Sequence, residues 1–370
     1  MNVHRRRFAV HASALALAAA VAAPASAHDG GHGFHARKVF TSTNSPGNNE
    51  LLVFAQGRSG ELVLTARVAT QGQGTGAGLG SQGAVTLSTD GRHVFVVNAR
   101  SNTVSTFVVR DDGVALASVV DSGGFLPISV TEDDGIVYVL NAGGAGNVAG
   151  FRNHHGELRP LTDGTRPLSA SGGTNPAQVG FGADGEILVV TEKATNRITS
   201  YPVHRNGVLG KAVVTASSGA TPFGFAFDRR DHLIVSEATA SAASSYCFDE
   251  RSATPTLVSA SVPNTQAAAC WVVVTPHGKH AYTANAGTST LSSYRIARSG
   301  RLELANAVAA STGANAGATD MAVSSDGRWL FALAPRSLQI VAFELAHDGS
   351  LLPAGAAGGL PAGSVGLAAN

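Results

Sequence analysis

The sequence repeats one pattern of strands and turns at a spacing of 44 to 50 residues, and this repeat limits the possible folds most strongly. Each copy has an apolar run, a tight turn, a second apolar run, a third alternating run and a second turn, as in residues 84–113. The first turns of the copies lie at Gly91, Gly135, Gly185, His232, Gly278 and Gly327. Four short strands in each period of this length are typical of the blades of a β-propeller.

Counting the strand types predicts seven blades and a closed ring. The third-strand unit occurs seven times, whereas the first strand occurs only six times before the last blade is complete. The segment Ser364–Ala369 resembles the start of the first strand at Ala84. We therefore predict an all-β fold over residues 37–370, with seven four-stranded antiparallel blades. The C-terminal strand is expected to enter the N-terminal blade and so remove exposed sheet edges.

Composition narrows the class of partner. Only 14% of the residues are charged and the net charge is +1, which excludes a broad electrostatic grip on nucleic acid or on acidic membranes. No stretch reaches the roughly 18 apolar residues that a membrane helix needs. We expect a monomer whose partner is a small molecule.

The N-terminal 27 residues have the organisation of an export signal. Arg5, Arg6 and Arg7 precede an apolar run over residues 12–23, and Ala25-Ser26-Ala27 fits a signal-peptidase site. The paired arginines are also typical of a twin-arginine signal, and a general secretory signal is the alternative. Residues 28–36 are rich in His and Gly and are predicted to be a disordered tail, with metal uptake as the alternative reading. A periplasmic or secreted location follows from this prediction.

One face of the predicted ring carries the candidate site, because the ends of second strands and the starts of first strands meet there. Ligands of such folds bind where loops vary around a central funnel. The predicted substrate-binding residues on this face are Asn98, Asn141, Asn285, Gln178, Phe223 and Trp271.

Acidic residues interrupt the repeat on the same face. Most second strands end in Asn, but two neighbouring ones end in Glu192 and Glu237. A carboxylate with a raised pKa could activate water, and Lys193 could face a developing oxyanion. Asp320, at the start of the last first strand, is a further candidate acid. The alternatives are a solvated rim in which Glu192 pairs with a neighbouring cation, and a loop-capping role for Asp320.

Several segments together resemble a known family. Val139-Leu140-Asn141, Asn175–Val179, Val190–Lys193, Thr221–Phe225 and Ala269-Cys270-Trp271 resemble the lactonase-type seven-bladed propellers, which include 6-phosphogluconolactonases and carboxymuconate cyclase, and are most similar to a secreted branch. The resemblance covers about residues 37–370 and implies a lactonase-like hydrolase or a cycloisomerase-like enzyme without a redox cofactor. First strands here begin without the His and Arg of sugar-phosphate lactonases, so an unphosphorylated substrate is expected.

Other readings stay open at this point. The same face could bind a protein, a peptide or a glycan without catalysis, and the Asn and Glu oxygens would suit a calcium ion. Cys247 and Cys270 could form a disulfide, or Cys270 could line the funnel as a small apolar group. Gly78–Gly83 fits G-x-G-x-x-G, but a strand follows it, so we expect a flexible loop between blades.

Overall fold

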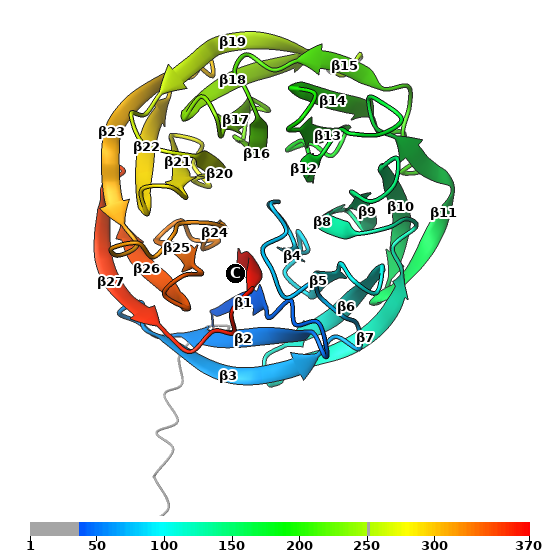
Figure 1. Cartoon of the computed structure of the whole chain (residues 1–370), viewed down its shortest axis with the longest axis horizontal. Coiled ribbons are helices and arrows are strands. Elements are labelled where there is room, and N and C mark those ends of the chain that lie inside the picture. Colours follow the sequence, from blue (N-terminus) through cyan, green and yellow to red (C-terminus); the bar gives the residue numbers. More distant parts are fainter. Residues whose placement is uncertain (1–36, 250–251) are drawn as a thin grey trace, which may run out of the picture. The chain divides into compact units, whose positions relative to one another are not determined.

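The computed structural model describes residues 37–249 and 252–370, and these residues form a ring of seven four-stranded antiparallel sheets (Figure 1). The predicted all-β propeller of seven blades is confirmed. The predicted export signal and the His-rich tail lie outside the described residues. None of the described residues form a helix of the length and hydrophobicity that a membrane crossing requires.

Each blade runs from an innermost strand, beside the ring centre, to an outermost strand. Blades 1 to 4, from the centre outwards, comprise β28 (Val365–Ala369), β1 (Lys38–Ser42), β2 (Glu50–Gln56) and β3 (Leu62–Ala69); β4 (Val85–Leu87), β5 (His93–Asn98), β6 (Thr103–Arg110) and β7 (Gly113–Asp121); β8 (Pro127–Asp133), β9 (Ile136–Asn141), β10 (Asn147–His154) and β11 (Glu157–Pro167); and β12 (Pro176–Phe181), β13 (Ile187–Glu192), β14 (Arg197–Pro202) and β15 (Val213–Ala216). Blades 5 to 7 comprise β16 (Pro222–Phe227), β17 (Leu233–Glu237), β18 (Ala242–Asp249) and β19 (Thr254–Pro263); β20 (Ala269–Val274), β21 (His280–Asn285), β22 (Thr290–Ile296) and β23 (Leu302–Ser311); and β24 (Met321–Val323), β25 (Trp329–Ala334), β26 (Gln339–Leu345) and β27 (Leu351–Ala357).

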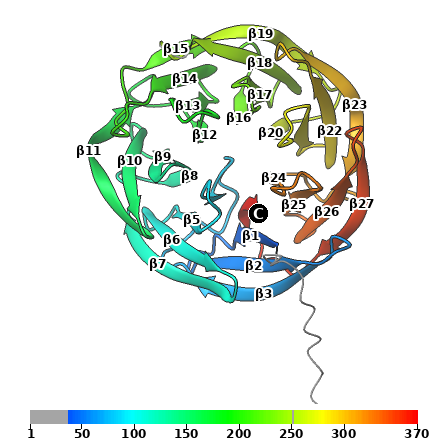
Figure 2. The same cartoon turned by 180° about the vertical axis from the view of Figure 1, so that it is seen from behind.

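The C-terminal strand closes the ring as predicted. β28 pairs antiparallel with β1, with Val39 opposite Ala369 and Ser42 opposite Val365. Figures 1 and 2 both place the C-terminus beside β1 at the inner side of the ring. Blade 1 therefore combines the two ends of the propeller, and no innermost strand is missing from the ring.

The first turn of each blade explains part of the glycine content. Gly91, Gly135 and Gly278 all have positive φ, between 65° and 75°, where a side chain would be strained. In blade 5 the equivalent residue is Asp231, with φ of 58°, and not His232 as the sequence spacing suggested. Asp tolerates the left-handed conformation, so the turn is kept without glycine.

Buried tyrosines link neighbouring blades. Tyr138 in β9 donates a hydrogen bond of 2.7 Å to the Gly207 carbonyl of blade 4, and Tyr282 in β21 donates one of 2.7 Å to the Gly349 carbonyl of blade 7. Both side chains are fully buried. The same contact thus recurs at two separate junctions, as expected when every blade follows one template.

Replacing Tyr282 by Phe is expected to lower the free energy of unfolding by about 1 kcal/mol, since the buried Gly349 carbonyl loses its partner. Urea denaturation monitored by fluorescence measures the change. Tyr138→Phe is the matched variant at the distant junction, and the two losses should add in the double variant. An unchanged midpoint for both single variants would show that these hydrogen bonds do not hold the blades together.

Candidate functional site

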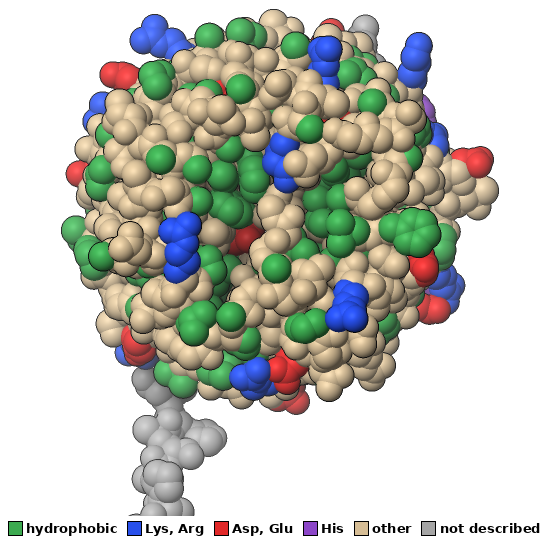
Figure 3. Space-filling view, viewed as in Figure 1, with side chains coloured by type: hydrophobic (Ala, Val, Ile, Leu, Met, Phe, Trp, Pro, Cys, Tyr) green, Lys and Arg blue, Asp and Glu red, His purple; other side chains and the backbone are tan. Residues whose placement is uncertain are grey.

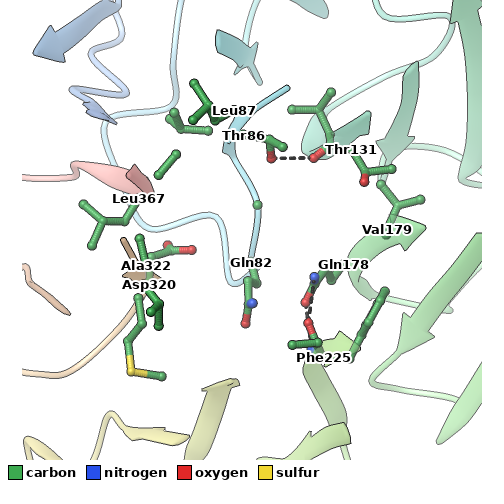
Figure 4. Close-up of a pocket in the computed structure, with 18 of the residues that line it drawn as sticks. Gln82, Thr86, Leu87, Thr131, Gln178, Val179, Phe225, Asp320, Ala322 and Leu367 are labelled. Carbon is green, nitrogen blue, oxygen red and sulfur yellow. Dashed lines mark hydrogen bonds between the residues drawn. The ribbon is translucent and has the colours of Figure 1, made fainter. Parts of the chain in front are cut away.

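A pocket of about 340 Å³ lies at the centre of the ring and is lined by the innermost strands (Figure 4). β4, β8, β12, β16, β24 and β28 contribute lining residues, and most of these are apolar. The polar side chains among them are Gln82, Thr86, Thr131, Gln178 and Asp320. The sequence-based candidates Gln178 and Asp320 therefore do share a cavity.

Asp320 is the one ionisable side chain among the described residues that line this pocket. It precedes β24 and is only 4% exposed. Its Oδ2 accepts a hydrogen bond of 3.1 Å from the Gly366 N–H in β28. Burial raises the pKa of Asp320 to about 7, although the N–H groups of Gly366 and Gly83 lower it. A carboxylate with such a pKa can accept or return a proton at neutral pH.

Asp320 occupies a position that recurs in blades 2 to 7, which we call the junction position. In each of these blades, the residue two positions before the end of the second strand pairs with one residue of the innermost strand. The junction position is the residue directly before that pairing partner. Its occupants in blades 2 to 7 are Ala84, Ser129, Gln178, Gly224, Trp271 and Asp320.

Three of these side chains, those of Ser129, Gln178 and Asp320, bind the backbone of the next blade. The Ser129 hydroxyl accepts a hydrogen bond of 3.2 Å from the Val179 N–H. The Gln178 amide binds both the N–H and the carbonyl of Phe225, at 2.7 and 3.0 Å. Neutral groups thus suffice to link blades, so the link to Gly366 does not by itself require a carboxylate at Asp320.

Glu192 and Glu237 do not line the central pocket. Both are fully buried at the ends of β13 and β17. Glu192 accepts hydrogen bonds from the Ser169 N–H at 2.9 Å and from the hydroxyls of Ser169, Thr195 and Thr199. Glu237 accepts them from the Gly219 N–H at 2.8 Å and from the Ser261 hydroxyl. Their catalytic role stays a prediction, and the contacts favour anchoring of the loops between blades.

The three candidate asparagines also bind neighbouring loops and strands, and Asn141 does so only as a donor, to the Ser122 carbonyl and to Asn147. Asn98, Asn141 and Asn285 are buried at the ends of β5, β9 and β21, outside the pocket. Asn98 accepts a hydrogen bond of 2.9 Å from Asn49 and donates one of 2.8 Å to Ser105. Asn285 does the same with Asn264 and Ser292, each at 2.8 Å. Their position at second-strand ends was predicted correctly, and their role in substrate binding stays a prediction.

Because Glu192 accepts four hydrogen bonds, Glu192→Gln is expected to destabilise the fold by about 1 to 3 kcal/mol. The kcat/KM of the folded variant should stay within a few-fold of the wild-type value. Glu237→Gln disturbs two hydrogen bonds and should have the smaller effect on stability. Thermal melts and lactone hydrolysis by each variant test this. A large loss of hydrolysis without a loss of stability would instead support a catalytic role for Glu192.

Lys193, Phe223 and Trp271 form one cluster, and none of them is among the described residues that line the central pocket. The Lys193 ammonium lies 4.9 Å from the centroid of the Phe223 ring, and the Phe223 and Trp271 ring centroids are also 4.9 Å apart. Burial lowers the pKa of Lys193 to about 8. Lys193 also donates a hydrogen bond to the Gly80 carbonyl, so this cluster contacts the loop that crosses the ring.

That loop, residues 70–84, connects blade 1 to blade 2 but reaches blades on the far side of the ring. Ser81 accepts a hydrogen bond of 2.8 Å from the Trp271 indole, and the Gln82 N–H donates one of 3.1 Å to the Ala177 carbonyl. Figure 3 shows a ridge across the centre of this face between two hollows with largely hydrophobic walls. The segment expected to be a flexible connection is thus docked on the innermost strands; we call it the crossing loop.

Gln82 in the crossing loop is the site residue that sequence reasoning missed. Its Nε2 donates a hydrogen bond of 2.9 Å to the Val272 carbonyl, and its Oε1 accepts one of 3.0 Å from the Val272 N–H. These are the contacts that Gln178 makes with Phe225. The only signal in the sequence was a polar amide within a Gly-rich segment, which does not identify its partner.

Both cysteines are free in the structure. Cys270 is buried near Lys193, and burial raises the pKa of its thiol to about 12, whereas Cys247 is half-buried. In the described part of the chain, no group of three or more His, Cys, Asp or Glu side chains could hold a metal ion.

The comparisons with known proteins agree with the fold. The family model of the seven-bladed β-propeller lactonases matches residues 145–273 and 258–364, which together span more than half of the chain. No curated protein matches the sequence.

Solved structures are similar over almost their full length. A putative 6-phosphogluconolactonase from Bacteroides fragilis has a TM-score of 0.71 at 16% identity, with 94% of this chain and 99% of that chain covered. The periplasmic gluconolactonase of Pseudomonas aeruginosa has a TM-score of 0.66 at 14% identity, with 89% and 98% covered. A functionally unknown protein from Desulfotomaculum acetoxidans has a TM-score of 0.71 at 15% identity, with 90% and 98% covered. At such identities the likeness shows the fold alone.

Proposed function

The chain belongs to the seven-bladed β-propeller lactonase family, and on this premise we propose that it hydrolyses a small, unphosphorylated lactone in the central pocket. The observation that carries the proposal is Asp320, a buried carboxylate with a pKa of about 7 in a pocket otherwise lined by uncharged residues. An ionisable group whose pKa is strongly shifted within a cavity is a candidate catalytic group.

Asp320 acts as the general base in this proposal. Its carboxylate accepts a proton from water, and the water oxygen attacks the lactone carbonyl carbon. When the tetrahedral intermediate collapses, the bond between the carbonyl carbon and the ring oxygen breaks, and Asp320 returns the proton to the leaving alkoxide. The products are a hydroxy acid and the regenerated carboxylate, so atoms and protons balance.

The pocket lining limits the class of substrate. Among the described lining residues no Lys or Arg is present to bind a phosphate, which requires charge-assisted hydrogen bonds. Val179, Phe225 and Leu367 instead offer apolar contacts, and Thr131 and Gln178 offer a hydroxyl and an amide. These walls favour an uncharged lactone of modest size.

We further propose that the protein is exported from the cytoplasm. The basic and apolar N-terminal segments of the sequence support delivery to the periplasm or the exterior, where an unphosphorylated lactone would be the substrate available. Cell fractionation with an antibody against the propeller tests the location, and a purely cytoplasmic protein would contradict it.

A panel of sugar, aliphatic and aromatic lactones tests the function, with wild type and Asp320→Asn assayed in the presence and absence of a chelator. We expect hydrolysis of at least one class by wild type, no effect of the chelator and loss of hydrolysis in Asp320→Asn. Failure of wild type on every lactone would contradict the proposal and favour a propeller that binds without catalysis.

A further inference from the structure

Blade 5 contacts blade 6 through hydroxyls such as that of Ser236, which donates to the Cys270 carbonyl, but it has no side chain at its junction position to do so. Its junction position holds Gly224, whereas Ser129, Gln178 and Asp320 bind the next blade from the equivalent positions. Without such a side chain, the backbone N–H and carbonyl of Val272 in β20 would have no partner from blade 5. Gln82 supplies both hydrogen bonds from the crossing loop.

Gly224 and Gln82 are sterically complementary. A Cβ atom added at Gly224 would lie 2.1 Å from the Gln82 Oε1 and 2.8 Å from the Cys270 carbonyl oxygen. Even alanine at residue 224 would therefore displace the Gln82 side chain. Because Gly224 has no side chain, the side chain of Gln82 from the crossing loop can dock beside it.

The residue that follows Gln82 lines the same pocket as the candidate catalytic carboxylate. The Gly83 N–H lowers the pKa of Asp320, and the Gly83 carbonyl accepts a hydrogen bond of 2.9 Å from the Val130 N–H. Gly83 has φ of 83°, and a Cβ there would lie 3.0 Å from the Ser129 hydroxyl. The backbone that reaches Asp320 is thus held between β8 and the docked Gln82.

Gln82 also covers part of the pocket wall. β20 is the one innermost strand that contributes no described residue to the pocket lining, and Gln82 binds that strand. Figure 4 shows Gln82 between Asp320 and Gln178 in the pocket. The docked Gln82 thus forms the pocket wall on the side of β20.

We propose that Gln82 is a positioning residue, which docks the crossing loop on β20 at Gly224 and thereby fixes the Gly83 N–H against the Asp320 carboxylate. Its kinetic consequence rests on the proposed lactone hydrolysis, but the docking itself does not. Gln82 forms no bond with substrate in this account. It acts through Gly83 and through exclusion of water from the carboxylate.

Hydrogen exchange tests the docking without any substrate. In Gln82→Ala and in Gly224→Ala, amides of residues 70–84 should exchange at least about tenfold faster than in wild type, because the loop opens locally. Gln178→Ala is the matched control, since it removes the same two hydrogen bonds at the junction of blades 4 and 5 and should leave this exchange unchanged. Unchanged exchange in both loop variants would overturn the proposal.

The pH profile of hydrolysis tests the effect on Asp320. Burial is the largest cause of its raised pKa, so an undocked loop should move the inflection of kcat/KM in Gln82→Ala to lower pH and decrease the maximum. The double variant Gln82→Ala/Gly224→Gln separates the roles, because a glutamine at residue 224 is placed to reach Val272 as Gln178 reaches Phe225 once the Cys270 carbonyl, 2.8 Å from the new Cβ, has shifted. We expect this variant to keep the shifted profile.

Recovery of the wild-type profile in the double variant would show that Gln82 merely links two blades, and would overturn the positioning role. If wild type hydrolyses no lactone, the pH dependence of the melting temperature replaces the kinetic profile as the readout of Asp320. Faster loop exchange with a shifted thermal profile would then support the positioning role while the proposed function fails. An unshifted thermal profile would overturn it.

Discussion

Replacing Asp320 by Asn is expected to abolish lactone hydrolysis and, at pH 8, to stabilise the protein. Loss of a general base decreases kcat by about 10²- to 10⁴-fold. The stabilisation arises because the ionised carboxylate is buried beside apolar strands, whereas Asn is uncharged and can still accept the hydrogen bond from Gly366. A catalytic carboxylate that destabilises the folded state is an example of the trade-off between activity and stability.

The pH dependence of this stabilisation has a definite sign. Burial raises the pKa of Asp320 to about 7 in the folded protein, while an Asp in an unfolded chain titrates near 4. Between these values the folded state binds more protons, so the contribution of Asp320 to stability falls as the pH rises. The gain in Asp320→Asn should therefore be absent near pH 4, grow up to about pH 7, and reach at most roughly 4 kcal/mol.

Melting temperatures of wild type and Asp320→Asn from pH 4 to 9 measure this gain. Ser129→Ala is the control, because it removes a neutral group from the junction position of blade 3 and its effect should not depend on pH in this range. A melting temperature of Asp320→Asn below that of wild type at pH 8 would contradict a buried, destabilising carboxylate.

Removal of residues 364–370 is expected to destabilise the whole propeller, and not only blade 1. β28 is the innermost strand of blade 1, and its residues Val365, Leu367 and Ala368 are buried against neighbouring strands. Each large buried side chain contributes about 1.5 to 3 kcal/mol, and the deletion also exposes the edge of β1 and removes the Gly366 N–H from Asp320.

Equilibrium denaturation of the truncated chain measures the loss, which should amount to several kcal/mol in a single transition. Leu367→Ala should lose about 2 to 3 kcal/mol, whereas Leu352→Ala, on the exposed face of β27, should change stability by less than about 0.5 kcal/mol. A truncated chain that melts like the intact one would show that β28 does not close the ring.

Much of the fold was predictable because each blade repeats one local pattern. The alternation of apolar runs and turns specified the strands, and the missing first strand identified β28 as the closing strand. The first turn of blade 5 was predicted one residue too late, at His232. Glycine is absent there, and Asp231 takes the left-handed conformation instead.

The site was less predictable, for two physical reasons. Glu192 stands out in the repeat, yet the hydroxyls of Ser169, Thr195 and Thr199 give its carboxylate the hydrogen bonds of a structural anchor. The docking of Gln82 on Val272 joins residues 190 positions apart that share no repeat equivalence. Sequence periodicity reveals contacts that recur from blade to blade, whereas among the described residues a side chain of the crossing loop binds an innermost strand in this way at one junction.

The most direct test of the central claim is the kcat/KM of wild type and Asp320→Asn on the lactone that wild type hydrolyses fastest, measured from pH 5 to 9. We predict that wild-type kcat/KM rises with pH to a plateau, with an inflection near pH 7, because the ionised carboxylate is the base. Asp320→Asn should lack both the inflection and at least about 99% of the plateau activity. Full activity of Asp320→Asn with the wild-type inflection would contradict the assignment of Asp320 as the catalytic base.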